Sequence, residues 1–276
     1  MWGMGRYLRL LLAFARFGLV NEMAFRSNFL IKLFVQVFWL ALMLAFYSTV
    51  FALNNNSPVA GWSKWQFLCF LGCYFALEGV VETFFLGNCN EMTNLVRSGD
   101  LDLYLVKPID EQFLVSCRKI DWSSVPNIVM GLSLMGISIA HLSISLSPAH
   151  LILFPLLFVC GVALAYSFLL MLSSTAIWTV RNQSLMELWW LCTTLMRYPR
   201  TIFQGPVGDP LKWFFTYILP ILLIVNIPVE TVTGELQSIE ALWRWSIFTV
   251  VATIALLWLS RRFFKFALQS YRSASS

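Results

Sequence analysis

Apolar runs long enough to cross a lipid bilayer recur along this 276-residue chain, separated by short polar stretches. A helix needs about 20 apolar residues to cross ~30 Å of hydrocarbon. We expect six such spans, at residues 29–53, 65–87, 125–142, 151–180, 185–203 and 243–259. The pattern predicts an all-α integral membrane protein whose single transmembrane domain occupies residues 1–276.

The N-terminal segment, residues 6–26, has leucines at helical spacing and three arginines, Arg6, Arg9 and Arg16, on another side. This amphipathic pattern is typical of a helix that lies in the membrane interface with its arginines among anionic headgroups. The segment also fits a solvated approach to the first span, and the pattern alone leaves both readings open.

The segment before the last span, residues 204–234, is apolar but contains Pro220 and Pro228, each of which removes a helical hydrogen bond. If it crossed the membrane, seven spans would leave the basic residues of 261–272 outside, against the positive-inside rule. A re-entrant extracellular hairpin kinked at Pro220 gives six spans and places both termini in the cytoplasm. Its backbone should then be packed inside the protein.

Composition supports a membrane protein without a soluble domain. Hydrophobic residues make up 59% of the chain and charged residues only 12%, against roughly 25% charged in ordinary globular proteins. A catalytic domain of ~100 residues has no room between the spans. The net charge of +5 comes from Lys and Arg beside apolar runs, where they set membrane orientation rather than bind nucleic acid. The cysteines lack accompanying ligands, so we expect them to serve packing.

The longest polar stretch, residues 88–121, contains a segment of unusual pattern at 97–110. Gly99 permits a turn conformation closed to other residues, and Pro108 blocks continuation of a helix. Between them acids alternate with leucines: Asp100, Leu101, Asp102, Leu103 and Leu105. A solvated linker does not need three large apolar side chains. The segment therefore docks either against its own helix ends or against a cytoplasmic partner.

Two acids in the second span, Glu78 and Glu82, are four residues apart and so share one helix face. A charge at membrane depth costs about 2.5–3.5 kcal/mol on insertion scales. The pair should face the bundle interior, either as a contact to substrate or a gate, or as a polar latch between helices. The pattern does not decide between these roles.

Residues 97–110, RSGDLDLYLVKPID, resemble the first cytoplasmic loop of permease subunits in type-2 ABC transporters, the exporter class. The approach to the first span at residues 22–29 is similar to that family's. So are Tyr198-Pro199, Pro220 and residues 228–234, which match its extracellular hairpin region.

This resemblance implies a six-span subunit that forms half of a permease pair, with an identical or related second permease. Two separate cytoplasmic ATPase subunits would bind ATP and Mg. Residues 6–26 would be the interfacial helix and 88–121 the coupling loop, whose helix within 91–110 fits a cleft in the ATPase. Its coupling residues would be Gly99, Asp100, Leu101, Asp102, Leu103, Leu105 and Pro108. The chain would lie in a prokaryotic inner membrane.

The chain contains no G-x-x-x-x-G-K-[ST] phosphate loop, so any ATP must be hydrolysed by another subunit. The function indicated is the permease of an ATP-driven exporter of a lipid-linked glycan, lipid, peptide or amphipathic drug. A proton-driven secondary transporter is one alternative, but such folds show internal repeats that this chain lacks. A membrane-embedded transferase is another, and it would need clustered catalytic side chains where the chain offers only His141 and His150.

Overall fold

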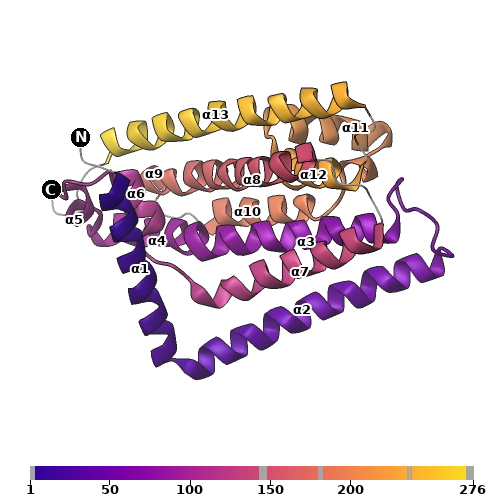
Figure 1. The fold of residues 1–276 in the computed structure, drawn as a ribbon. Coiled ribbons are helices and arrows are strands. Elements are labelled where there is room, and N and C mark those ends of the chain that lie inside the picture. Colours follow the sequence, from indigo (N-terminus) through magenta and orange to yellow (C-terminus); the bar gives the residue numbers. More distant parts are fainter. Residues whose placement is uncertain (1–3, 143–147, 180–182, 235, 237, 272–276) are drawn as a thin grey trace.

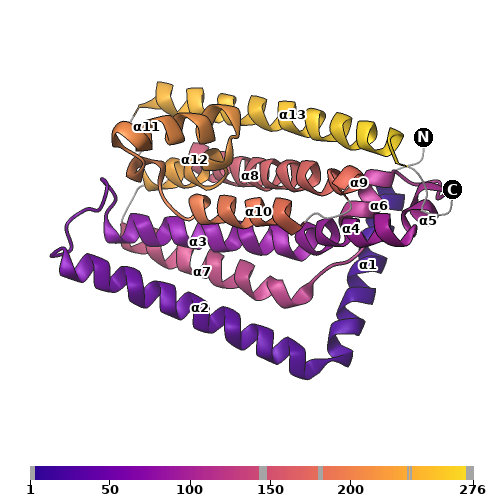
Figure 2. The same cartoon turned by 180° about the vertical axis from the view of Figure 1, so that it is seen from behind.

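The computed structural model describes residues 4–142, 148–179, 183–234, 236 and 238–271, and this part of the chain is almost entirely helical. The long helices lie side by side, while α1 runs across their ends (Figures 1 and 2). The α-helices are α1 (Met4–Ala24), α2 (Arg26–Leu53), α3 (Lys64–Val81), α4 (Gly87–Ser98), α5 (Leu101–Leu105), α6 (Glu111–Cys117), α7 (Val125–Leu142), α8 (Pro148–Ser174), α9 (Ala176–Thr179), α10 (Gln183–Met196), α11 (Gly205–Trp213), α12 (Ile221–Thr233) and α13 (Ile239–Gln269). Two π-helical turns, η1 (Glu82–Leu86) and η4 (Phe214–Ile218), and two 3-10 turns, η2 (Trp122–Ser124) and η3 (Arg200–Ile202), complete the described elements.

Five helical segments of the described chain are long and apolar enough to cross a membrane. They are Arg26–Leu53, Lys64–Ser98, Trp122–Leu142, Pro148–Thr179 and Ile239–Gln269. A sixth candidate is a bent pair, Gly205–Ile218 and Ile221–Thr233, whose halves meet at 88°. The chain is therefore a helical protein with five to six candidate spans. The bend falls at Pro220, where the sequence predicts a kink.

The second span extends beyond its predicted end. We expected it to stop at residue 87 and residues 88–121 to form a loop, but the helix continues through η1 and α4 to Ser98. The extension is stable because α4 buries Met92, Leu95 and Val96 on one side. The polar composition of this stretch thus reflects an amphipathic helix rather than a linker.

The predicted fifth span is shorter than expected. We placed it at 185–203, whereas α10 has 14 residues and ends at Met196, fewer than the ~20 needed for a full crossing. Pro199 follows shortly after, and a proline cannot donate the hydrogen bond that would continue the helix. The chain then forms the short turn η3 before α11.

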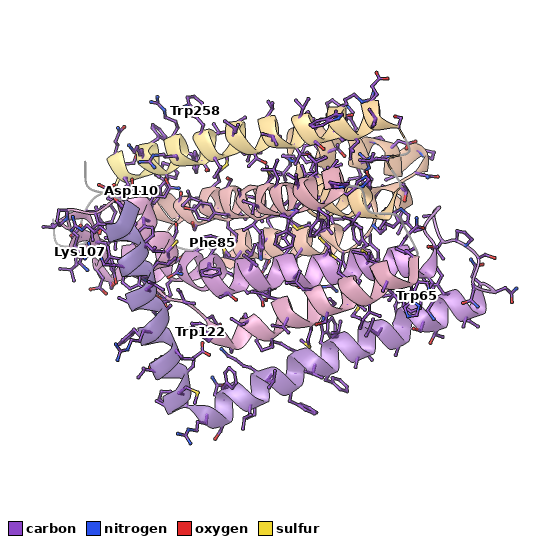
Figure 3. All side chains as sticks on the ribbon, in the orientation of Figure 1. Trp65, Phe85, Lys107, Asp110, Trp122 and Trp258 are labelled. Atoms are coloured by element: carbon purple, nitrogen blue, oxygen red, sulfur yellow. The ribbon has the colours of Figure 1, made fainter. Side chains whose placement is uncertain are left out.

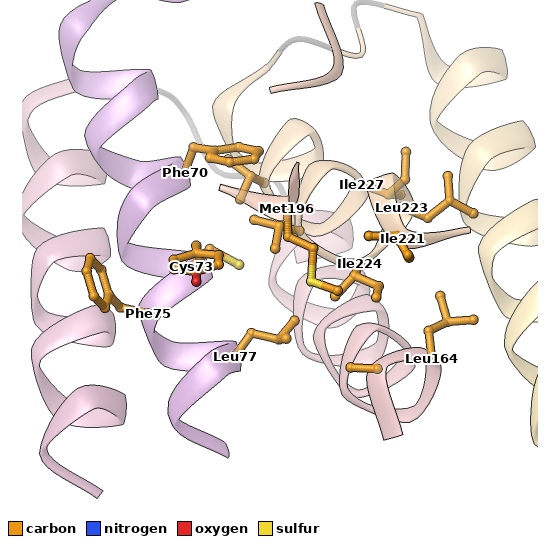
Figure 4. Close-up of a cluster of buried hydrophobic side chains, with 14 of the residues drawn as sticks. Phe70, Cys73, Phe75, Leu77, Leu164, Met196, Ile221, Leu223, Ile224 and Ile227 are labelled. Atoms are coloured by element: carbon orange, nitrogen blue, oxygen red, sulfur yellow. The ribbon is translucent and has the colours of Figure 1, made fainter. Parts of the chain in front are cut away.

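The helix α12 lies at the centre of the bundle, and all its residues are buried. Figure 4 shows Ile221, Leu223 and Ile224 of α12 among apolar side chains of α3 and α8. Such placement keeps the bent backbone away from lipid, which has no groups to satisfy exposed amides. The second half of the bent segment is thus packed inside the protein, as the sequence suggests.

Elements far apart in the sequence gather at one end of the bundle. The helices α1, α4, α5 and α6 lie beside the C-terminal end of α13, while the turn after α2 and helix α11 lie at the opposite end (Figures 1 and 2). At this end an ion pair joins α13 to the predicted coupling segment: Arg261 Nη2 lies 2.7 Å from Asp110 Oδ2. The predicted coupling segment and the end of the last helix therefore share one side of the protein.

Candidate translocation and coupling sites

A cavity of about 300 Å³ lies between α2, α3, α7 and α10. Both acids singled out in the second span, Glu78 and Glu82, contribute to its wall. The other lining residues are Val35, Gln36, Trp39, Phe75, Asn127, Trp190 and Arg197. Its volume lies at the lower end of the range for small-molecule sites.

Hydrogen bonds tie the two acids to different helices. Tyr74 Oη donates to Glu78 Oε1 at 2.7 Å, and Arg197 Nη2 donates to Tyr74 Oη at 3.2 Å. Glu82 Oε2 accepts a bond of 3.2 Å from Asn127 Nδ2. Glu78 is thereby connected to the residue after α10, and Glu82 to α7. Glu78 and Glu82 therefore line the same cavity but have different hydrogen-bond partners.

Arg197 is a site residue that the sequence analysis did not single out. It leans towards the rings of Tyr74 and Trp39, at 5.2 and 5.9 Å from their centroids. A basic residue at the end of an otherwise apolar run was the available signal. Three occluded polar atoms on this cavity wall lack a hydrogen-bond partner: Gln36 Oε1, Asn127 Oδ1 and Arg197 Nε. The wall of this cavity therefore contains polar groups that are buried without a hydrogen-bond partner.

The helix that carries Glu78 and Glu82 contains a π-helical turn. Residues 82–86 form the π-helical turn η1, which begins at Glu82. Single π-turns inside α-helices occur frequently at functional sites. Because the backbone N–H of Glu82 still donates to the carbonyl of Glu78, the π-turn redirects the side chains that follow Glu82 and leaves both acids on a regular α-helical turn.

The predicted coupling segment is a short helix at the end of the bundle. Gly99 ends α4 with a left-handed backbone, φ +79°, which favours glycine. The chain then turns into α5. Leu101 is fully buried, whereas the side chain of Leu103 is 65% exposed and Leu105 is half-buried. Pro108 and Asp100 are exposed.

The leucines of this segment therefore have different environments. Leu101 packs in a cluster with Met92, Val115 and Phe264, while Leu103 faces away from the protein. Asp102 lies against Tyr271 beyond the end of α13; burial, and then the nearby carboxylate, raise the pKa of that tyrosine. One leucine thus docks on its own helices, and another remains available to a partner.

Comparison with known families places the chain. The model of the ABC-2 family transporter protein matches residues 37–275, most of the chain. The chain belongs to the ABC-2 family of transporters. No curated protein and no solved structure gave a match.

Membership of the ABC-2 family accounts for the architecture. The chain is the multi-pass permease component of an ABC transporter, a transport protein of the membrane rather than a catalytic subunit. The family match covers the cavity acids, Arg197 and residues 99–106, which we call the α4–α5 turn, and it begins within α2. The crosswise helix α1 precedes the matched region.

Proposed function

We propose that this ABC-2 permease forms one half of a permease pair in an ATP-driven exporter of the inner membrane. Two separate ATPase subunits, which bind ATP and Mg, drive it through the α4–α5 turn. Both termini lie in the cytoplasm, the bent segment is a re-entrant hairpin, and α1 lies in the membrane interface. The observation that carries the coupling role is the outward-facing Leu103 on a turn otherwise anchored by the buried Leu101.

The α4–α5 turn has the features of a mechanical contact. Leu101 fixes it to α4, α6, α8, α9 and α13 through one apolar cluster. Exposed beside it are Leu103 and Val106, whose side chains are 65% and 86% accessible. Burying these two apolar side chains against a partner would remove their surface from water, which favours association. A force applied to the turn would reach helices from both halves of the chain.

The polar cavity supports a role in the substrate pathway. It combines two acids and an arginine with tryptophans from α2 and α10. Charged side chains within membrane segments characteristically mark transport paths. Helix α2 stands apart from the bundle, and only 6% of its most apolar stretch is buried inside the protein (Figure 1). We place the second permease on the α2 side of the cavity, where it would complete the wall.

Co-purification with the ATPase tests this function. The chain should retain a nucleotide-hydrolysing partner under mild detergent, and the complex should hydrolyse ATP faster with substrate lipid or peptide extracts present. Leu103→Ala should weaken ATPase binding or uncouple hydrolysis, because truncating a buried interface anchor typically costs above about 2 kcal/mol. Asp102→Asn should have a smaller effect, as rim charges contribute less.

A matched control separates coupling from folding. Leu53 is 82% exposed at the far end of α2, so Leu53→Ala should leave both ATPase binding and hydrolysis unchanged. Leu101→Ala should instead destabilise the permease by about 2–5 kcal/mol, the usual cost for a buried leucine. If no ATPase accompanies the unmutated chain, or if Leu103→Ala behaves like Leu53→Ala, the proposed coupling is wrong.

A further inference from the structure

A second cavity, of about 340 Å³, lies in the elbow where α1 meets α2. Figure 3 shows Trp122 in the corner between α1 and the bundle. Its indole Nε1 donates to the carbonyl of Ala15, and its backbone N–H donates to Glu22 Oε1, both at 2.8 Å. Gly18 allows α1 to approach closely, since a Cβ there would lie 2.5 Å from the Ile120 carbonyl oxygen. The elbow is therefore a fixed structure with a defined cavity.

The charges around this elbow cavity do not balance. Four acids line it, Glu22, Glu82, Glu91 and Asp121, against two lysines, Lys32 and Lys119. Glu91 is paired with Arg118 and Lys119, and Asp121 with Lys32 at 3.6 Å. Among the described residues, neither Glu22 nor Glu82 takes part in an ion pair. The cavity thus has two carboxyl groups in excess.

An acceptor without a hydrogen-bond partner also favours a positively charged ligand in this cavity. Glu22 Oε2 is occluded from solvent and has no hydrogen-bond partner. Glu82 lines both the elbow cavity and the polar cavity between the spans. Buried acceptors without a partner cost free energy, which a ligand that donates hydrogen bonds would recover.

The remaining walls are aromatic. They consist of Phe14, Phe17, Phe25 and Phe29, from α1 and the start of α2. Phe17 and Phe25 are largely exposed at the outer side of the elbow. Aromatic faces attract cations electrostatically and also accept hydrocarbon. A molecule with a charged end and an apolar tail would match both parts of this lining.

We propose that the elbow cavity binds the ammonium group of an amphiphile, with Glu22 and Glu82 as its counter-charges. The apolar tail extends along the phenylalanines into the surrounding bilayer. The ammonium group belongs either to a membrane lipid with a primary amine headgroup or to an amphipathic amine dissolved in the leaflet. Because Glu82 also borders the polar cavity, the site lies next to the proposed pathway. Its existence does not depend on ATPase coupling.

Equilibrium binding to the purified full-length permease tests this site. The probe is tritiated dodecylamine, measured in dodecyl maltoside micelles, whose headgroup carries no charge, with empty micelles as the blank. Binding should saturate, and unlabelled dodecylamine should compete while dodecanol, which has the same tail without charge, should not. Glu22→Gln and Glu82→Gln should each weaken binding by about tenfold or more, the loss expected for a charge-assisted hydrogen bond.

The same assay includes a control variant and distinguishes the two sources of the ammonium group. Glu240 is an exposed acid in the first turn of α13, so Glu240→Gln should bind the probe like the unmutated chain. If added phosphatidylethanolamine displaces the probe and phosphatidylglycerol does not, the ligand is the bilayer lipid. If neither displaces it, the ligand is a smaller amphiphilic amine. The proposal is wrong if dodecylamine binding does not saturate or if dodecanol competes equally well. It is also wrong if both Gln variants fold and bind the probe like the unmutated chain.

Discussion

Arg200 and Glu230 form a buried ion pair that joins the turn η3 to the central helix α12. Arg200 Nη2 lies 2.7 Å from Glu230 Oε2, and the two side chains are 13% and 3% exposed. The backbone N–H of Arg200 also donates to Asn226 Oδ1 at 2.7 Å, and its guanidinium lies over the Trp245 ring. This arrangement fixes the segment before α11 against the core.

Removing one member of the pair should therefore destabilise the fold. Arg200→Met or Glu230→Met leaves a buried group without its partner, a loss of about 3–5 kcal/mol in comparable cases. Arg200→Met together with Glu230→Met should cost less than the two single changes combined. Thermal unfolding in detergent measures this, with the exposed Arg244→Met as control. Additive effects of the two changes would show that the pair is not coupled.

The two cavity acids should respond differently to neutralisation. Glu78→Gln removes the negative charge that attracts Arg197, and Tyr74→Phe removes the hydroxyl that links the two, so both should lower thermal stability by weakening the connection from α3 to the residue after α10. Loss of a hydrogen bond to a charged group typically costs about 1.5–3 kcal/mol. Glu82→Gln can still accept from Asn127 and should fold normally.

Transport per folded molecule then assigns the roles. We expect Glu82→Gln to reduce it, since Glu82 borders both cavities. If Glu82→Gln leaves transport intact, the acid is a latch rather than part of the pathway. If Glu78→Gln changes neither stability nor transport, its link to Arg197 contributes nothing measurable.

Accessibility of single cysteines tests the orientation. In a background without the six native cysteines, residues replaced at Asn55 and Gln204 should react with an impermeant thiol reagent in intact cells. A cysteine at Asp102 should not, because the α4–α5 turn lies at the opposite end of the bundle from the turn after α2 (Figure 1). A cysteine at Glu235 should also react and one at Ser273 should not, although both positions lie outside the described residues. Labelling at Ser273 with protection at Glu235 would indicate seven full spans.

The carboxyl of Glu22 should make stability depend on pH. Burial, and then the neighbouring Asp121 carboxylate, raise the pKa of Glu22 from 4.5 to about 7. Lys32 acts against this rise, and the acids Glu82 and Glu91 and the base Lys119 line the same cavity. The folded chain therefore holds this proton to a higher pH than the unfolded chain. Its stabilising contribution is complete below pH 4.5 and is lost as the pH rises towards 7.

Glu22→Gln removes this titration. The variant should match the unmutated chain in melting temperature near pH 4, exceed it increasingly from pH 5 to 7, and keep that advantage at pH 8. Thermal unfolding across this range measures the difference, with Glu240→Gln as the control for an exposed acid. A constant difference at all pH values would mean that Glu22 titrates normally.

Much of the secondary structure follows from the sequence because lipid selects helices by length and apolarity. The first and third spans, α2 and α7, begin and end within a few residues of the predicted bounds. Pro220 marks the bend because a proline removes a helical hydrogen bond wherever it lies. Gly99 marks the end of α4 for an equally local reason, its left-handed backbone. The family resemblance at 97–110 was likewise readable from consecutive residues.

Contacts across the chain required the tertiary structure. The sequence shows alternating leucines in the coupling segment, but only packing against Met92 and Phe264 decides that Leu101 is buried while Leu103 faces outward. The spacing of Glu78 and Glu82 places them on one face, yet Tyr74 bonds the first and Asn127 of α7 bonds the second. Pairing of Arg200 with Glu230 joins residues 30 positions apart. Local chemistry determined where helices form; the partners of each polar side chain depended on which helices came to lie beside it.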